Sequence, residues 1–128
     1  MATHTTDFWP DDIRQSNQRT PVALLREQAT ALGEKTRNVV TAEVESDSAG
    51  QEFVHELYLV APVLHYRYQL LTIRHPLFFY PMGVTVPDTF DWDTVDSEEA
   101  FVVWLKGVLA SDKTKKVIQA LIDQSQGS

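Results

Sequence analysis

The amino-acid sequence predicts an α+β fold in which one antiparallel sheet is covered by helices. A long stretch rich in aromatic and β-branched residues, 53–86, occupies the middle of the chain and holds all four tyrosines. Such residues are enriched in strands. Apolar residues at helical spacing flank this stretch on both sides. The connections between the expected strands are short, which favours antiparallel neighbours because parallel strands need long crossovers.

Length and composition indicate one globular domain. The chain has 128 residues, of which 43% are hydrophobic and 23% are charged, and these values are typical of folded domains. It contains no cysteine, so disulfides and thiolate metal sites within the chain are excluded. The first residues lack a leader pattern, and no apolar run approaches the roughly 20 residues of a membrane span. We therefore expect a soluble, cytoplasmic protein.

The first 19 residues (1–19) are expected to form a polar tail that precedes a single domain at 20–125. Apart from the initial Met, its large apolar side chains are Phe8, Trp9 and Ile13. Phe8 and Trp9 together present too much apolar surface to be left in water, so we expect them to dock on the domain or on a partner. Whether the tail is ordered is left open by the sequence.

The first helix is expected at 21–34. Thr20 can supply an N-cap oxygen, and Pro21 suits the first helical position. Apolar residues then recur at spacings of three and four along one stripe, namely Val22, Leu25, Ala29 and Leu32. Gly33 is placed to end the helix.

Four strands are expected in the middle of the chain, separated by a polar turn at 46–50 and by Pro62 and Pro76. They cover residues 38–45, 52–61, 64–74 and 77–82, and a short run at 84–86 prolongs the fourth. Strict alternation would put every second side chain of the third strand on a single face, namely Tyr66, Tyr68, Leu70 and Thr72. Both faces of the second and third strands are substantially apolar, so we expect the second face of the sheet to need a cover.

An acidic connection at 87–96 and two helices are expected to complete the chain. Asp96 or Ser97 can cap the first of these helices, and Ser111 begins the second. Their apolar stripes contain Phe101, Trp104, Leu105 and Val108 in the first and Val117, Ile118, Leu121 and Ile122 in the second. The predicted order is α-β-β-β-β-α-α: an N-terminal helix, a four-stranded antiparallel meander sheet and two C-terminal helices.

The segment from Asp88 to Glu99 is the most distinctive surface feature, because it carries six acids, no base and two aromatic residues. Aromatic anchors surrounded by charge suit a protein interface. The net charge of -7 favours a basic protein partner over nucleic acid, although it also suits plain solubility. The predicted partner-binding residues are Asp88, Phe90, Asp91, Trp92, Asp93 and Asp96. Alternatively, Phe90 and Trp92 tuck into the core while the acids solvate a loop.

The sequence shows no pattern typical of a catalytic or metal site. His55, His65 and His75 invite a metal hypothesis, but we expect them to lie apart on the sheet and predict no metal site. The acidic run fails the calcium-loop pattern, because Asp96 and Val102 stand where Gly and Glu are required. No nucleophile motif or phosphate-binding glycine loop is found, so we expect no cofactor. Enzymatic activity is left open and is less favoured than binding.

Three functions are compatible with these observations. The leading hypothesis is a small acidic protein-binding module, of the immunity, inhibitor or chaperone kind suggested by size and charge, that masks a basic partner surface. The second is a structural homodimer or subunit that buries one sheet face. The third is a small-molecule site between sheet and helices, lined by Tyr58, Tyr66, Tyr68 and Trp104. A ligand or an unfamiliar active site on the sheet would use His55, Tyr58, His65, Tyr66, Arg67 and Tyr68.

Overall fold

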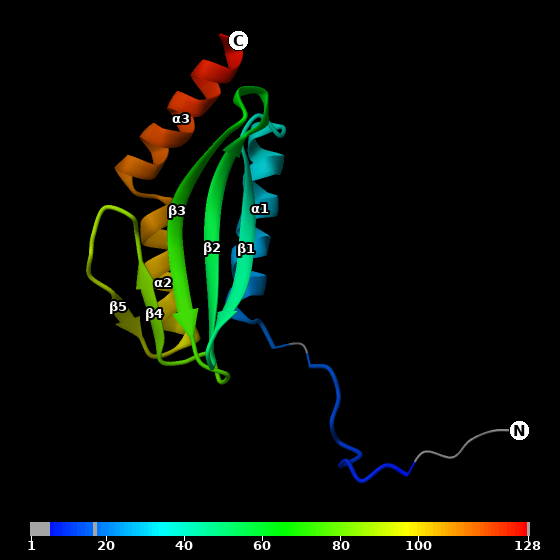
Figure 1. Ribbon diagram of the computed structural model, residues 1–128. Helices are drawn as coiled ribbons and strands as arrows, with labels where there is room; N and C mark the ends of the chain where they lie inside the picture. The colour runs from blue at the N-terminus through cyan, green and yellow to red at the C-terminus, as the bar shows by residue number, and fades with distance from the viewer. Residues whose placement is uncertain (1–5, 17, 128) are drawn as a thin grey trace, which may run out of the picture.

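A computed structural model describes residues 6–16 and 18–127 and has the expected order of elements, with five strands rather than four (Figure 1). The predicted tail therefore lies partly outside the described residues, at 1–5 and 17. The elements are α1 (Pro21–Thr36), β1 (Thr41–Ala49), β2 (Glu52–Ala61), the 3₁₀ turn η1 (Pro62–Leu64), β3 (Tyr66–His75), β4 (Met82–Thr85), β5 (Asp93–Val95), α2 (Glu98–Leu109) and α3 (Asp112–Gln126).

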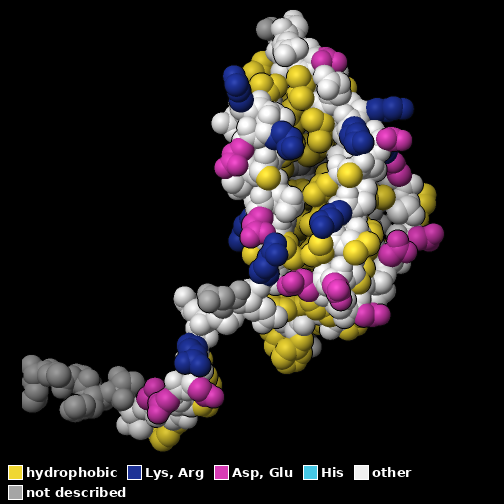
Figure 2. Space-filling view, turned by 180° about the vertical axis from the view of Figure 1, so that it is seen from behind, with side chains coloured by type: hydrophobic (Ala, Val, Ile, Leu, Met, Phe, Trp, Pro, Cys, Tyr) yellow, Lys and Arg dark blue, Asp and Glu magenta, His cyan; other side chains and the backbone are white. Residues whose placement is uncertain are grey.

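The five strands form one antiparallel meander in which each strand pairs with its neighbour in the sequence. All three helices lie against one face of this sheet, and the opposite face is open (Figure 1). Figure 2 shows the helical face from behind, with a strip of hydrophobic side chains between the helices. None of the helices in the described part of the chain is long and apolar enough to cross a bilayer.

The start of α1 is as predicted, but its end is not. The Thr20 hydroxyl accepts a hydrogen bond from the N–H of Ala23 at 3.2 Å, as an N-cap does. The helix continues past Gly33 and ends at Arg37, which has a left-handed φ of 55°. Gly33 is buried, and a Cβ there would lie 3.0 Å from Asn38 Oδ1. It therefore permits a close approach of the following chain rather than ending the helix.

The prediction of a strand at 77–82 is wrong. Pro76 and Pro81 offer the sheet no backbone donors, and Phe79 between them adopts a left-handed φ of 73°. These residues form a loop, and β4 begins only at Met82. A fifth strand lies inside the expected acidic connection, where Val95 pairs with Met82. Three residues are too few to show an alternating pattern, so the sequence does not predict β5.

A bulge between β2 and β3 changes which side chains face the helices. Leu57 lies opposite Leu71, whereas the next residue, Tyr58, lies opposite Gln69, so Leu70 has no partner on β2. Leu70 and Leu71 are consequently both buried, although they are adjacent in sequence. The strict alternation predicted for this strand therefore holds as far as Leu70 and reverses after it.

The core lies between the sheet and the helices. Its fully buried side chains come from β2, β3, β4, α1 and α2 and include Leu25, Leu57, Leu59, Leu71, Ile73, Val84 and Phe101. Burial of each such side chain is worth about 1.5–3 kcal/mol relative to leaving it in water. The helical face of the sheet thus supplies most of the apolar burial that stabilises the fold.

The open face of the sheet is polar, contrary to the expectation that it would need a cover. Arg67 of β3 pairs with Glu45 and Glu43 of β1, with nitrogen–oxygen distances of 2.6 and 3.7 Å. Its guanidinium lies 4.0 Å from the centroid of the Tyr58 ring. The Tyr58 hydroxyl donates to Glu56 at 2.5 Å, a bond that raises the pKa of Tyr58. These charged groups let this face contact water.

Candidate functional site

The connection between β4 and β5 carries an aromatic residue in full contact with water. Phe90 is completely exposed. The backbone beside it is held by local hydrogen bonds, because the Thr85 hydroxyl donates to the Asp91 carbonyl at 2.9 Å and the Asp91 N–H donates to the Thr89 hydroxyl at 3.1 Å. This connection, the β4–β5 loop, projects from the sheet beyond β4 and β5 (Figure 1). Phe90 is therefore displayed by an ordered backbone rather than buried.

Trp92 has a different position from Phe90. Its ring lies over Gly83 of β4, where an added Cβ would come within 3.1 Å of the indole. Arg74 of β3 stacks on the same ring, with its guanidinium carbon 4.6 Å from the ring centroid, an arrangement typical of a cation–π contact. Trp92 remains 41% exposed. The alternative that both aromatics enter the core is wrong, since Trp92 covers the open sheet face and Phe90 covers nothing.

The carboxylates at 88–96 differ in whether they form an ion pair. Asp88 forms an ion pair with Lys113 at the start of α3. Among the residues that the structure describes, the side chains of Asp91, Asp93 and Asp96 have no ion-pair partner. The cap of α2 is Ser97, whose hydroxyl accepts from the N–H of Ala100 at 3.1 Å, so Asp96 is not used as a cap. Three carboxylates therefore have no ion-pair partner among the described residues: Asp91 next to Phe90, Asp93 in β5 and Asp96 after β5.

The expectation that the three central histidines lie apart is wrong for two of them. His55 and His75 both face the helices, and their Nε2 atoms lie 3.2 Å apart. His55 Nδ1 lies 2.7 Å from the Ser46 hydroxyl, and His75 Nδ1 lies 2.7 Å from the Pro76 carbonyl oxygen. His65 is separate and exposed at the end of η1. The described residues contain no group of three or more His, Cys, Asp or Glu side chains that could hold a metal ion.

The hydrogen bonds assign the protons of this pair. The carbonyl of Pro76 only accepts, so Nδ1 of His75 carries a proton, and in the neutral form of this ring Nε2 is the acceptor. The Nε2–H of His55 then donates to His75, and the Ser46 hydroxyl donates to His55 Nδ1. Burial, with smaller contributions from His75 and Arg26, lowers the pKa of His55 to about 4, which keeps its ring neutral at pH 7.

The six residues proposed for a sheet-face site do not form one site. His55 is buried under the helices, His65 lies at a turn, and Tyr58 and Arg67 stack on the open face. Tyr66 and Tyr68 lie beside α3, where they line a cavity of about 420 Å³. The bulge and the alternation of strand faces separate these residues, although they are close in sequence.

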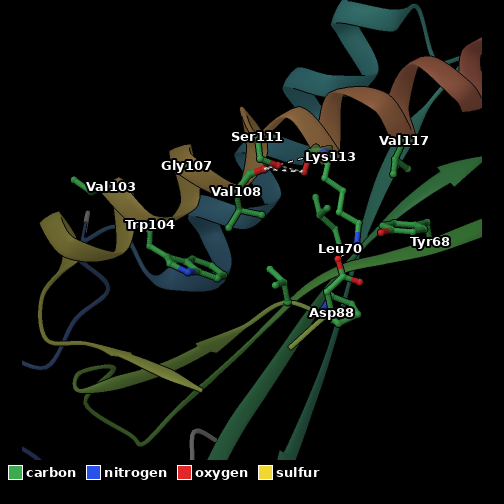
Figure 3. Close-up of a pocket in the computed structure, with 13 residues that line it drawn as sticks. Tyr68, Leu70, Asp88, Val103, Trp104, Gly107, Val108, Ser111, Lys113 and Val117 are labelled. Atoms are coloured by element: carbon green, nitrogen blue, oxygen red, sulfur yellow. Dashed lines mark hydrogen bonds and ion pairs between the residues drawn. The ribbon is translucent and has the colours of Figure 1, made fainter. Parts of the chain in front are cut away.

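A second cavity, of about 390 Å³, lies between β3, α2 and α3 (Figure 3). Its walls include Tyr68, Leu70 and Trp104, so two of the four residues predicted for a small-molecule site do line it. Lys113 reaches past Tyr68 to Asp88 at its rim (Figure 3). The Ser111 and Thr114 hydroxyls on its helical side are bonded to the Val108 carbonyl. The cavity is therefore mainly apolar, with one ion pair at its edge. We name it the α2–α3 cavity.

The predicted partner-binding residues are in three different structural situations. Phe90, Asp91, Asp93 and Asp96 are exposed, Asp88 is paired with Lys113, and Trp92 is packed on the sheet. Comparison of the chain with protein-family models, with curated proteins and with solved structures found no match. We therefore argue its function from the geometry of these groups.

Proposed function

We propose that this protein is a small acidic binding module whose β4–β5 loop masks a basic surface of a protein partner. The observation that carries the proposal is the full exposure of Phe90 in an acidic segment where Asp91, Asp93 and Asp96 form no ion pair with the described residues. Burying a Phe side chain is worth about 1.5–3 kcal/mol. In its own fold Phe90 contributes none of this energy, but in a partner's pocket it would serve as an anchor.

The charges and the backbone of the loop support the same proposal. Asp91, Asp93 and Asp96 would attract a basic partner before contact, and the net charge of -7 acts in the same direction. The hydrogen bonds from Thr85 and to Thr89 hold the loop in one conformation. A preorganised loop loses less conformational entropy on binding than a mobile one.

The test compares association rates of charge variants. A partner is first isolated from the native host with the full chain as bait, and binding is then followed at several salt concentrations. Asp91→Lys, Asp93→Lys and Asp96→Lys together should slow association at least about tenfold and flatten its salt dependence. The matched control reverses three exposed acids elsewhere, namely Glu34, Asp47 and Asp123. Equal rates for the two triple variants would contradict the role of the loop.

A second candidate function is binding of a small apolar molecule in the α2–α3 cavity. Its volume of about 390 Å³ falls in the range of about 300–1,000 Å³ found for ligand pockets, and its aromatic walls, Tyr68 and Trp104, are typical of such sites. Gly107→Leu would place a side chain in this space. The fluorescent probe anilinonaphthalene sulfonate should bind the wild type more strongly than this variant. Equal binding would refute the second candidate.

A further inference from the structure

An apolar groove runs along the helical face between α1 and the pair formed by α2 and α3. Its floor consists of Leu57, Leu59 and Leu70 of the sheet, and Leu32 of α1 and Ile118 of α3 stand on opposite walls. The enclosed volume is about 220 Å³. In Figure 2 the groove is visible as the hydrophobic strip between the helices. The three leucines of the floor are buried, whereas Leu32 and Ile118 on the walls are partly exposed.

The N-terminal segment, described at residues 6–16, carries apolar side chains that its own domain does not cover. Phe8 and Trp9 are 92% and 76% exposed, and Ile13 is also exposed. The hydrogen bonds of this stretch join residues close in sequence, such as the one from the Trp9 N–H to Asp7 at 2.8 Å. Figure 1 shows the segment running away from the domain. Three large apolar side chains therefore face water.

We infer that the N-terminal segment of one copy of this chain docks in the groove of a second copy, and that the exchange is reciprocal. Each chain carries one exposed apolar segment and one apolar groove, so a two-fold symmetric pair satisfies both features twice. Figure 2 shows the segment leaving the lower end of the domain and running away from the hydrophobic strip. Arg19, next to the helix cap, forms an ion pair of 2.7 Å with Glu27 of α1.

The charges of the two surfaces are complementary. The segment has three acids, Asp7, Asp11 and Asp12, against one base, Arg14. The groove is lined by Lys35, which has no ion-pair partner among the described residues. Figure 2 shows Lys and Arg side chains on both sides of the hydrophobic strip, with Asp and Glu side chains among them. The acidic aromatic segment would therefore meet an apolar groove whose charged lining residue is Lys35, and its docking should weaken as salt is added.

The first experiment measures molar mass in solution by light scattering over a hundredfold range of concentration. The full chain should be a dimer. The double variant Phe8→Ala, Trp9→Ala should raise the dimer dissociation constant at least about tenfold, because exposed aromatic anchors carry most of an interface's binding energy. Phe78→Ala, which removes another aromatic that is 81% exposed, should leave the mass unchanged. A monomeric wild type, or a double variant that stays dimeric, would overturn the inference.

The second experiment tests the groove. Ala31→Glu places a carboxylate on its wall, whereas Thr30→Glu adds the same group to the same helix outside the residues that line the groove. Both positions are exposed, and Glu is a good helix former, so both variants should fold. Only Ala31→Glu should shift the equilibrium toward monomer. Equal masses for the two variants would show that the groove is not the docking site.

A disulfide test separates the second copy from the same chain. The chain has no cysteine, so Asp11→Cys with Lys35→Cys introduces one pair that joins segment and groove. Oxidation should give covalent dimers on a non-reducing gel, and Asp11→Cys with Arg67→Cys, on the open sheet face, should not. A disulfide within one chain would place the segment in its own groove and overturn the exchange. Absence of any disulfide would overturn the docking itself.

Discussion

The Nε2 atoms of His55 and His75 lie 3.2 Å apart beneath the helices, and the centroids of their rings lie 5.2 Å apart. The pairing register brings them together, because Phe53 lies opposite His75 and His55 lies two residues further along β2. The ring of Phe53 also stacks on that of His75, with the two ring centroids 5.6 Å apart. The two rings relay hydrogen bonds from Ser46 to the Pro76 carbonyl. Burial holds the His55 ring of this chain neutral at pH 7, because it lowers the pKa of His55 to about 4.

Acid should destabilise the fold through His55. Its pKa falls from the ordinary 6.5 to about 4 on folding, so between these values the unfolded chain binds a proton that the folded chain does not. The free energy of unfolding therefore decreases as the pH falls from 6.5 to about 4, by a total of about 3 kcal/mol, and this contribution stays constant at lower pH. Urea unfolding at a series of pH values measures the loss.

His55→Gln isolates this contribution from that of the carboxylates, which also titrate in acid. The glutamine amide can still donate toward His75 but does not titrate. The variant should lose less stability than the wild type between pH 6.5 and 4. His65→Gln, at an exposed position, should follow the wild type. Parallel curves for wild type and His55→Gln would contradict the assigned titration.

Replacing the two aromatics of the β4–β5 loop should have opposite consequences. Trp92→Ala removes the ring that packs on Gly83 and under Arg74, and we expect a loss of about 1–2 kcal/mol in the free energy of unfolding. Phe90→Ala should change that free energy by less than about 0.5 kcal/mol, because Phe90 is fully exposed. Chemical denaturation measures both. A similar loss for the two variants would contradict their different positions.

The bulge in β3 predicts that two adjacent leucines are both essential for stability. Leu70 and Leu71 are each buried, so Leu70→Ala and Leu71→Ala should each cost about 2–5 kcal/mol. In a regular strand one of two neighbours faces the opposite side of the sheet, where truncation costs far less. Thermal or urea unfolding of the two variants tests this. A loss below about 1 kcal/mol for either leucine would argue against the bulge.

Alanine at the two helical glycines should have opposite effects. Gly107 lies inside α2, and a Cβ there would meet no atom of the described residues within 4 Å. Gly107→Ala should therefore stabilise the fold by about 0.5–1 kcal/mol. At Gly33 a Cβ would lie 3.0 Å from Asn38 Oδ1, so the same substitution should bring no gain or a loss. Melting temperatures of the two variants test the contrast.

Features governed by near neighbours in the chain were predictable. Thr20 caps α1 through a residue three positions away, and β2 spans the predicted 52–61 because Pro62 ends it. The α+β class and the order of elements follow from the same local patterns. The exposure of the acids at 88–99 was also predictable from composition, since a run of six acids without a base is rarely buried.

The tertiary structure decided what depends on pairing between distant segments. The approach of His55 to His75 requires a specific register and the same face of two strands, and no local pattern encodes that register. The bulge at Leu70, the short β5 and the packing of Trp92 on Gly83 likewise exist only after the strands have paired. Sequence by itself determined the three helices and the three longer strands, because short-range sterics and apolar spacing govern those choices, but it did not reveal the loop at 77–81 or β5. Which side chains meet was decided by strand register, because a shift of one residue turns every side chain to the opposite face.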